Sequence, residues 1–400
     1  MNLRVPGVNN SRPKITVVSH TNELGGASLS LCMFVEALLS FADVTVLVPA
    51  KKTIITDRLT SLPIQVVFME QEPGVLHMYS GGKSCLSVNY WVQLWKSRKF
   101  IRFIDSYLKQ KECDVFVVNS MTLSYLSPVL KQHGIKSVCL VRETKRYESN
   151  FANNFLAHRL SQFSKVVFIS QFDCNNHALT ETNSSIIYDC LASKAFNSDR
   201  STSRRSFGLI DDDFVVCYVG GLSWLKGIST LVSSSRFLNS ERIRYLIAGD
   251  FSRLSSWKSC LSISAMYYRR QLKRLRKLER AGRVVFAGSL PDISPVLAAS
   301  DLLVFPARLP HQARPIFEAA AYKIPVVLPN YPHFYEFVTH GVNGLYFKPS
   351  CPMSLAATIA YASNLSSLKE MGEANRDRCG LNHSINRLNE SIKELFQELV

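Results

Sequence analysis

Short apolar runs alternate with helical stretches along most of this 400-residue chain. The runs are rich in β-branched side chains, which is typical of buried parallel strands. In the first half they are Lys14–Ser19, Val44–Val48, Ile64–Met69, Val115–Val118, Ser137–Val141, Val166–Ile169 and Ser185–Tyr188. In the second half they are Phe214–Val219, Arg244–Ala248, Val284–Ala287, Leu302–Phe305 and Val326–Leu328. With helical patterns such as Ala27–Leu39 and Trp91–Lys109 between them, they predict an α/β fold with two doubly wound parallel sheets.

The chain is longer than one hydrophobic core usually serves, so we expect two domains. A polar segment rich in Ser and Arg, residues 191–206, separates the two series of strands and is interpreted as a linker. We therefore expect an N-terminal Rossmann-like domain at 1–190 and a C-terminal one at 207–383, facing each other across a cleft. A final helix is expected at 384–400, and its return to the first domain is one option.

The region 284–347 contains the most informative loop in the chain. A loop, Pro306–Arg314, follows one apolar run and leads into a helix that is expected to open at Pro315, a residue that suits the first helical turn. The helix start offers free N–H groups and the positive end of a dipole, and Arg314 adds a cation. Glu318 lies one turn into the helix. This pattern predicts a phosphate-binding site.

A glycine pair, Gly25-Gly26, stands between the first apolar run and the helix that begins at Ala27. In open parallel sheets ligands bind at the carboxyl ends of the strands, where this pair is expected to lie. Two interpretations are open: the glycines form a tight turn, or they let a ligand approach the backbone.

Composition adds a strongly basic balance. The formal net charge is +16 and the hydrophobic fraction is 46%. Such a charge suits anionic partners, namely nucleotide phosphates, acidic lipids or nucleic acid. The first twelve residues hold no apolar signal-peptide core, and no run approaches the ~20 apolar residues needed to cross a bilayer. The ten cysteines are scattered without a C-x-x-C pair, which favours reduced thiols. We expect a cytoplasmic protein, soluble or peripheral to a membrane.

The segment Ser256–Arg283 carries a dense run of Lys and Arg against the single acid Glu279. Its apolar positions fall at helical spacing, which predicts an amphipathic helix. Three interpretations are open: a solvated surface helix, a helix that touches an anionic membrane, or a nucleic-acid contact. Nucleic acid is the least favoured, because aromatic residues interleave with the basic ones only around Tyr267–Arg270.

Four segments together resemble the retaining glycosyltransferases of family four, the glycosyl transferases group 1, which have the two-domain GT-B fold. The segments are TNELGGASLSL (21–31), VCYVGGLSWLKGISTLV (216–232), VVFAGSLPDISPVLAASDLLVFPA (284–307) and RPIFEAAAYKIPVVLPN…EFVTHGVNGLYF (314–347). The resemblance follows nearly the whole chain in order.

The resemblance implies a set of donor-binding residues in this sequence. In the family an arginine and a lysine hold the donor diphosphate, and a glutamate binds the nucleotide ribose. Lys226 matches the lysine and Glu318 the ribose-binding glutamate. The residues implied at the donor site are Gly25, Gly26, Gly220, Gly221, Lys226, Gln312, Ala313, Arg314, Pro315, Ile316 and Glu318.

The chain departs from the family pattern at two positions. Gly221 stands where the family has its arginine, and Pro310 stands where it has a second glutamate. We hypothesise that Arg314 supplies the missing positive charge, although a plain surface arginine is the alternative. The departures also keep a second class of protein open, a catalytically silent GT-B protein that acts as a binding or regulatory partner.

Family members often place a histidine of the first domain near the reacting sugar. The nearest position here is Arg142-Glu143, after the run Ser137–Val141, and His20 and Asn119 are further candidates at strand ends. Glu143 and His20 are the catalytic candidates. A buried ion pair of Glu143 with Arg142 or Lys145 is an equal alternative. The resemblance implies a metal-independent, hexosyltransferase-type enzyme without a cofactor. It would transfer a sugar from a nucleotide sugar to a glycan or lipid-linked glycan, in polysaccharide or cell-envelope biosynthesis.

Overall fold

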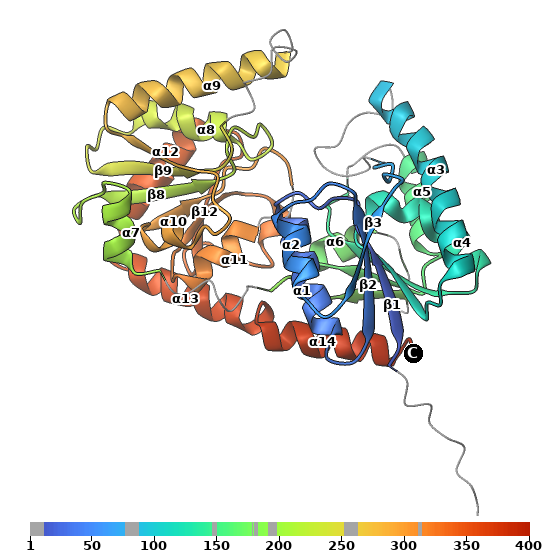
Figure 1. The fold of residues 1–400 in the computed structure, drawn as a ribbon. Helices are drawn as coiled ribbons and strands as arrows, with labels where there is room; N and C mark the ends of the chain where they lie inside the picture. Colours follow the sequence, from blue (N-terminus) through green and yellow to red (C-terminus); the bar gives the residue numbers. More distant parts are fainter. Residues whose placement is uncertain are drawn as a thin grey trace, which may run out of the picture. The chain divides into compact units, whose positions relative to one another are not determined.

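The computed structural model divides the chain into two compact units, each built on a parallel sheet (Figure 1). One unit comprises Met1–Tyr188 and Asn386–Val400, and the other comprises Asp189–Ile385. The structure describes residues 12–76, 88–145, 150–177, 179, 183–190, 198–251, 263–310 and 314–400.

The first unit contains a seven-stranded sheet in the order β3-β2-β1-β4-β5-β6-β7, with every neighbouring pair parallel. Its strands are β1 (Lys14–Val18), β2 (Asp43–Pro49), β3 (Gln65–Met69), β4 (Val115–Val118), β5 (Lys136–Val141), β6 (Lys165–Phe168) and β7 (Ser184–Ile186). Its helices are α1 (Gly26–Leu38), α2 (Ile54–Thr60), α3 (Val88–Gln110), η1 (Met121–Leu126), α4 (Ser127–Gln132), α5 (Asn150–Leu160) and α6 (Gln171–Asn176). The chain runs outward in one direction from β1 and then in the other from β4, so the switch point lies between these strands.

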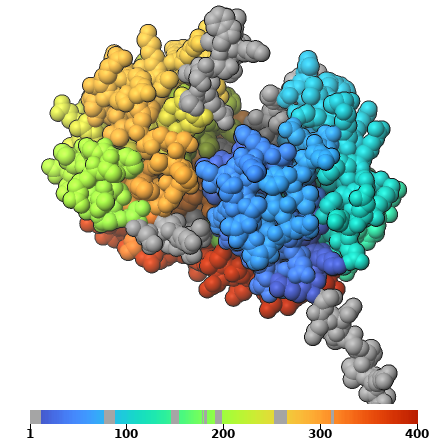
Figure 2. Space-filling model, viewed as in Figure 1, coloured from blue at the N-terminus to red at the C-terminus, as the bar shows by residue number. Residues whose placement is uncertain are grey.

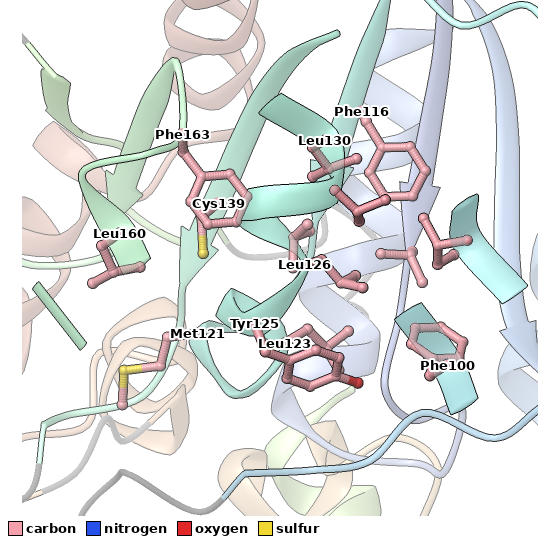
Figure 3. Close-up of a cluster of buried hydrophobic side chains, with 14 of the residues drawn as sticks. Phe100, Phe116, Met121, Leu123, Tyr125, Leu126, Leu130, Cys139, Leu160 and Phe163 are labelled. Carbon is pink, nitrogen blue, oxygen red and sulfur yellow. The ribbon is translucent and has the colours of Figure 1, made fainter. Parts of the chain in front are cut away.

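The core of this unit lies between the sheet and the helices on one of its faces (Figure 3). Phe100 of α3, Phe116 of β4 and Cys139 of β5 are all fully buried there. The fully buried positions of α3 begin at Ser97, and the partly buried Leu94 just before it also packs on this core.

The last helix, α14 (Ile385–Gln397), packs its apolar face on the first unit. The ring of Phe396 lies 6.2 Å from that of Phe34 and 5.9 Å from that of Phe41. Lys165 and Glu398 form an ion pair of 2.8 Å at the end of the chain.

The second unit contains a six-stranded sheet in the order β10-β9-β8-β11-β12-β13, again with all neighbours parallel. Its strands are β8 (Phe214–Val219), β9 (Ile243–Ala248), β10 (Val284–Gly288), β11 (Leu302–Val304), β12 (Val326–Pro329) and β13 (Gly344–Phe347). Its helices are α7 (Arg200–Ser206), α8 (Ile228–Ser234), η4 (Ser235–Phe237), α9 (Ile263–Arg280), α10 (Ser294–Ala298), α11 (Arg314–Ala321), η6 (Pro332–Phe334), α12 (Pro352–Ser363) and α13 (Leu368–Asn382). Each apolar run predicted from the sequence forms a strand, whereas β13 was not among the predictions.

Helix α7 occupies the second half of the segment that was expected to be a linker, 191–206; residues 191–197 lie outside the described part. The reason is Arg204, which is 2% exposed and donates hydrogen bonds to four backbone carbonyls and to the carboxylate of Asp301. A side chain within the segment expected to be a linker therefore fixes α7 to the second unit. Among the described residues, no helix is both long enough and apolar enough to cross a membrane.

Candidate functional site

The donor-site candidates of the second unit gather where the carboxyl ends of β8 and β11 lie side by side. From β8 the chain runs to β9 and β10 on one side, and from β11 to β12 and β13 on the other. The edge between β8 and β11 is therefore the switch point, where ligands of open parallel sheets bind.

The turn that follows β8 explains why Gly221 is a glycine. Gly221 has φ +58°, and a Cβ built on it would lie 2.7 Å from the carbonyl oxygen of Asp250. Gly249 is equally tight, because its Cβ would lie 2.2 Å from the amide nitrogen of Gly221. The backbones at the ends of β8 and β9 thus touch each other, and the position of the family arginine has no room for a side chain.

The loop from β8 to α8 is fixed against the loop from β11 to α11. Gly227 has φ +75°, and a Cβ there would lie 1.7 Å from the carbonyl oxygen of Pro306. The amide of Arg308 donates to the carbonyl of Leu225 over 2.9 Å. These contacts make one continuous backbone surface from two loops that are far apart in sequence.

Arg308 is a cation that the sequence analysis did not single out. Its guanidinium lies over the ring of Trp224 at 4.9 Å from the centroid, and its Nη1 donates to Ser229 Oγ over 3.3 Å. Its carbonyl accepts a hydrogen bond of 2.7 Å from the hydroxyl of Tyr331. The signal available in the sequence was an arginine shortly after the carboxyl end of a predicted strand.

Lys226 lies in the loop from β8 to α8, and the aliphatic part of its side chain passes beside the turn that follows β8. A Cβ on Gly220 would lie 2.6 Å from Cδ of Lys226, so the glycine makes room for the lysine. Burial lowers the pKa of Lys226, an effect opposed by the negative charge of Glu318. The ammonium has no hydrogen-bond or ion-pair partner in the described part of the chain. The structure therefore brings together the two residues that matched the family pattern most closely.

Arg314 and Glu318 are bound to each other on α11. Arg314 Nε donates to Glu318 Oε1 over 2.9 Å, and the two side chains are only 14% and 17% exposed. Arg314 is the first residue of the helix, followed by Pro315 and the buried Ile316. Gln312 and Ala313, which were also expected at the donor site, lie outside the described residues.

The glycine pair of the first unit has open space around it. Gly25 is extended, with φ −179° and ψ 172°, and it caps α1, which begins at Gly26. A Cβ on either glycine would meet no other atom within 4 Å. Neither a left-handed turn nor a close protein neighbour accounts for the pair, which favours the interpretation that a ligand approaches here.

Glu143 lies at the carboxyl end of β5 and is held by donors from two strand ends. Its carboxylate accepts a short hydrogen bond from Ser120 Oγ and bonds of 3.2 Å from the amides of Met121 and Arg142. Burial raises the pKa of Glu143, and the hydrogen bond from Ser120 is the largest effect opposing that rise. Ser120 was not a candidate from the sequence, although it stands directly after a predicted strand.

The side chain of Arg142 contacts Asn119, and its positive charge opposes the rise in the pKa of Glu143. Arg142 Nε donates to Asn119 Oδ1 over 2.8 Å, and no side-chain ion pair joins Arg142 to Glu143. The Nδ2 of Asn119 is fully buried and has no hydrogen-bond partner within the described residues. An amide that is buried without a partner is unusual in a folded protein, which makes Asn119 a candidate for ligand binding.

His20 follows β1, and Glu143 follows β5, with β4 paired between these two strands. The two catalytic candidates thus belong to one edge of one sheet, but the structure gives no direct contact between them.

Solved structures of other proteins share the fold of this chain. Anabaena HepE, crystallised in complex with UDP-glucose, superposes with a TM-score of 0.76 at 19% identity, covering 96% of this chain and 99% of that one. Sucrose-phosphate synthase from Thermosynechococcus elongatus superposes with a TM-score of 0.77 at 15% identity, covering 97% and 99%. The chain has the GT-B fold of two Rossmann-like domains, which confirms the fold class expected from the sequence.

The sequence comparison agrees with the fold. Residues 199–378 match the family model of glycosyl transferases group 1. An uncharacterised glycosyltransferase of Methanocaldococcus jannaschii is 26% identical over 157 residues, which are 38% of this chain and 36% of that protein. The match thus spans about a third of the length of that relative. The family match contains Lys226, Arg308, Arg314 and Glu318.

Proposed function

We propose that this protein is a glycosyltransferase that transfers a sugar from a nucleotide-sugar donor to a glycan or a lipid-linked glycan. One observation carries the proposal: Lys226 and Glu318, both within the family match, interact electrostatically at the switch point of the second unit. An ammonium at this edge that has no hydrogen-bond or ion-pair partner among the described residues suits the diphosphate of a nucleotide sugar.

The donor diphosphate is assigned to three cations and one helix start. Lys226 and Arg308 come from the two loops that pack together, and Arg314 stands at the first position of α11. The helix dipole adds positive potential at that end. Glu318 uses Oε1 to accept from Arg314, which leaves Oε2 for the ribose hydroxyls of the donor. That HepE was crystallised with UDP and with UDP-glucose supports a donor of this class.

The proposed transfer is retaining, and of the hexosyl type. The acceptor hydroxyl attacks on the face that the nucleoside diphosphate leaves, and the departing phosphate oxygen takes the hydroxyl proton. The cations named above stabilise the leaving group, so the mechanism requires no divalent metal. Glu143 and His20 are assigned to binding of the reacting sugars, and Asn119 Nδ2 supplies a further donor there. Gly25 and Gly26 are assigned to donor approach, because the space beside them is open.

We propose that the enzyme acts at the cytoplasmic face of a membrane, in polysaccharide or cell-envelope biosynthesis. Helix α9 supports this assignment through an exposed stripe of Arg269, Arg270, Lys273, Arg276, Lys277 and Arg280. The opposite face, with Ala265, Gln271 and Leu275, is buried in the second unit. A stripe of cations on a fixed helix suits acidic lipid headgroups.

The test is a thermal-shift screen of the purified chain against nucleotides and nucleotide sugars. A ligand that binds only the folded state raises its stability, by about 2.7 kcal/mol at a concentration one hundred times Kd. We expect a uridine nucleotide sugar to raise Tm in the native protein and to raise it far less in Lys226→Met. Lys369→Met, which removes an exposed lysine of α13, is the matched control and retains the full shift. If no nucleotide shifts Tm, or if both variants respond like the native protein, the donor assignment is wrong.

A further inference from the structure

The first turns of α3 present a stripe of large apolar side chains to solvent. Val88, Trp91, Val92 and Trp95 are 80%, 63%, 44% and 56% exposed. Their spacing of i, i+3, i+4 and i+7 places them on one side of the helix. These four residues are called the α3 stripe below. Figure 1 shows α3 in cyan at the margin of its unit, and Figure 2 shows its atoms on the surface.

Helix α3 is anchored mainly by residues from Leu94 onward. Its buried residues are Ser97, Phe100, Ile104 and Leu108, all after the α3 stripe, while no residue from Val88 to Lys96 is buried. The first half is positioned by Leu94, which is partly buried against the core, and by two polar contacts. These are a bond of 2.9 Å from the amide of Val75 to Gln93 Oε1 and an ion pair of 2.8 Å between Lys96 and Glu72. The α3 stripe thus contributes nothing to the core, although its residue types are those that proteins usually bury.

The same side of the helix continues as a stripe of cations. Arg98, Lys99 and Arg102 are exposed and stand at the positions that follow the α3 stripe at helical spacing. Lys99 Nζ lies over the ring of Trp95 at 3.8 Å from its centroid. The acid on this helix, Asp105, is already occupied by Lys109 and His133. One continuous surface therefore combines tryptophan and valine with three cations, none of which forms an ion pair with another described residue.

From this arrangement we propose that α3 is a docking surface for an anionic lipid bilayer, with the α3 stripe inserted at the headgroup level. Tryptophan is the side chain best suited to that depth, because its ring is apolar and its N–H remains hydrated. Arg98, Lys99 and Arg102 complement acidic headgroups at the same level. The tryptophan and cation pattern distinguishes this surface from the basic stripe of α9, which carries no tryptophan among its described residues. The proposal depends neither on sugar transfer nor on the α9 contact.

The first experiment measures binding of the full-length protein to vesicles by cosedimentation. We expect binding to vesicles of phosphatidylcholine with phosphatidylglycerol, and at least about tenfold weaker binding to phosphatidylcholine alone. Trp91→Ser combined with Trp95→Ser is expected to weaken binding to the anionic vesicles by about tenfold or more, because it removes the inserted rings. Ile54→Ser is the matched control, since Ile54 is an exposed apolar residue on α2 of the same unit, and it retains native binding.

A second pair of variants separates the two helices. Arg98→Gln with Lys99→Gln weakens binding if α3 makes the contact, whereas Arg269→Gln with Lys273→Gln reports on α9. Loss of binding in the α9 variant alone, with the tryptophan variant binding normally, overturns the α3 proposal and leaves the proposed function intact. A failed nucleotide screen leaves the vesicle result unaffected.

The third measurement uses the tryptophans as reporters in a protein with Trp224→Phe and Trp257→Phe, which keeps only Trp91 and Trp95 of the four in the chain. We expect their emission to shift to shorter wavelength on anionic vesicles and to be quenched by brominated lipid. Unchanged emission overturns the proposal. So does a blue shift that appears without vesicles as protein concentration rises, because a second copy of the chain then covers the stripe.

Discussion

Arg314 Nε donates to Glu318 Oε1 over 2.9 Å, so the proposed phosphate ligand and the proposed ribose ligand are bound to each other. Both side chains are mostly buried, which makes the pair one unit of charge rather than two independent contacts. We predict that Arg314→Ala and Glu318→Ala each weaken donor binding, and that the double variant is no worse than Glu318→Ala. Calorimetric titration with the nucleotide found in the screen measures the three affinities.

The two single variants and the double variant form a double-mutant cycle. Measured on the free energy of unfolding, this cycle is expected to give a coupling of about 1 kcal/mol for a buried, hydrogen-bonded pair. The exposed i,i+3 pair Arg276–Glu279 is the control, and its cycle is expected to give less than about 0.5 kcal/mol. Normal donor affinity in Arg314→Ala contradicts the assignment of this arginine to the diphosphate.

Restoring the family arginine at Gly221 is predicted to damage the protein rather than improve it. The backbone there has φ +58°, and a Cβ would stand 2.7 Å from the carbonyl oxygen of Asp250. Gly221→Arg should therefore lower the free energy of unfolding by about 2 kcal/mol or more, without tighter donor binding. Gly341→Ala separates the cost of a positive φ from the cost of the steric clash, because Gly341 has φ +79° but lies in open space. Gly341→Ala should lower the free energy of unfolding by only about 1 kcal/mol. Denaturant unfolding measures the free energy of unfolding of both variants. A Gly221→Arg protein as stable as the native one contradicts the prediction.

Arg204 is predicted to be a structural residue although it lies in a stretch of polar sequence. Its guanidinium is buried between α7 and Asp301, with a bond of 2.8 Å from Nη2 to Asp301 Oδ2. Arg204→Met should cost about 3–5 kcal/mol, because it leaves buried oxygen atoms without their donors. The neighbouring Arg205 is exposed, and Arg205→Met should change stability by less than about 0.5 kcal/mol. Equal effects of the two substitutions in urea unfolding would refute the prediction.

His177 is predicted to make the first unit sensitive to acid. Burial lowers the pKa of His177 to about 4, with the positive charge of Lys145 acting in the same direction, while its bond to the carbonyl of Asp173 opposes the shift. A histidine whose folded pKa lies below its unfolded value stabilises the protein above about pH 6.5. That contribution is lost as the pH falls from there toward 4, at up to about 1.4 kcal/mol per pH unit.

The measurement is the difference in unfolding free energy between the native protein and His177→Gln across this pH range. The variant should lose less stability on acidification, because glutamine does not titrate. The exposed His158 provides the control, and His158→Gln should follow the native pH profile. A native-like slope in His177→Gln would contradict the assignment.

The strand pattern by itself determined the fold class, because short β-branched runs separated by helical stretches have few alternatives to a parallel sheet. It also indicated the loops before these helices, since their glycines and the helix start expected at Pro315 are local features. The matched residues Lys226 and Glu318 are 92 positions apart in the sequence, and only the pairing of β8 with β11 brings their charges together.

Only the tertiary structure decided which of these residues have room and partners. Gly221 is a glycine because the backbone after β9 occupies the place of its side chain, and Arg204 is buried because Asp301 lies opposite. Helix α3 shows most clearly what cannot be predicted from the sequence. Apolar residues at helical spacing predict an apolar face of a helix, but they do not predict which part of the protein covers it. Periodicity depends on the helix alone, whereas burial depends on its neighbours, and on the first turns of α3 the neighbours leave both tryptophans exposed.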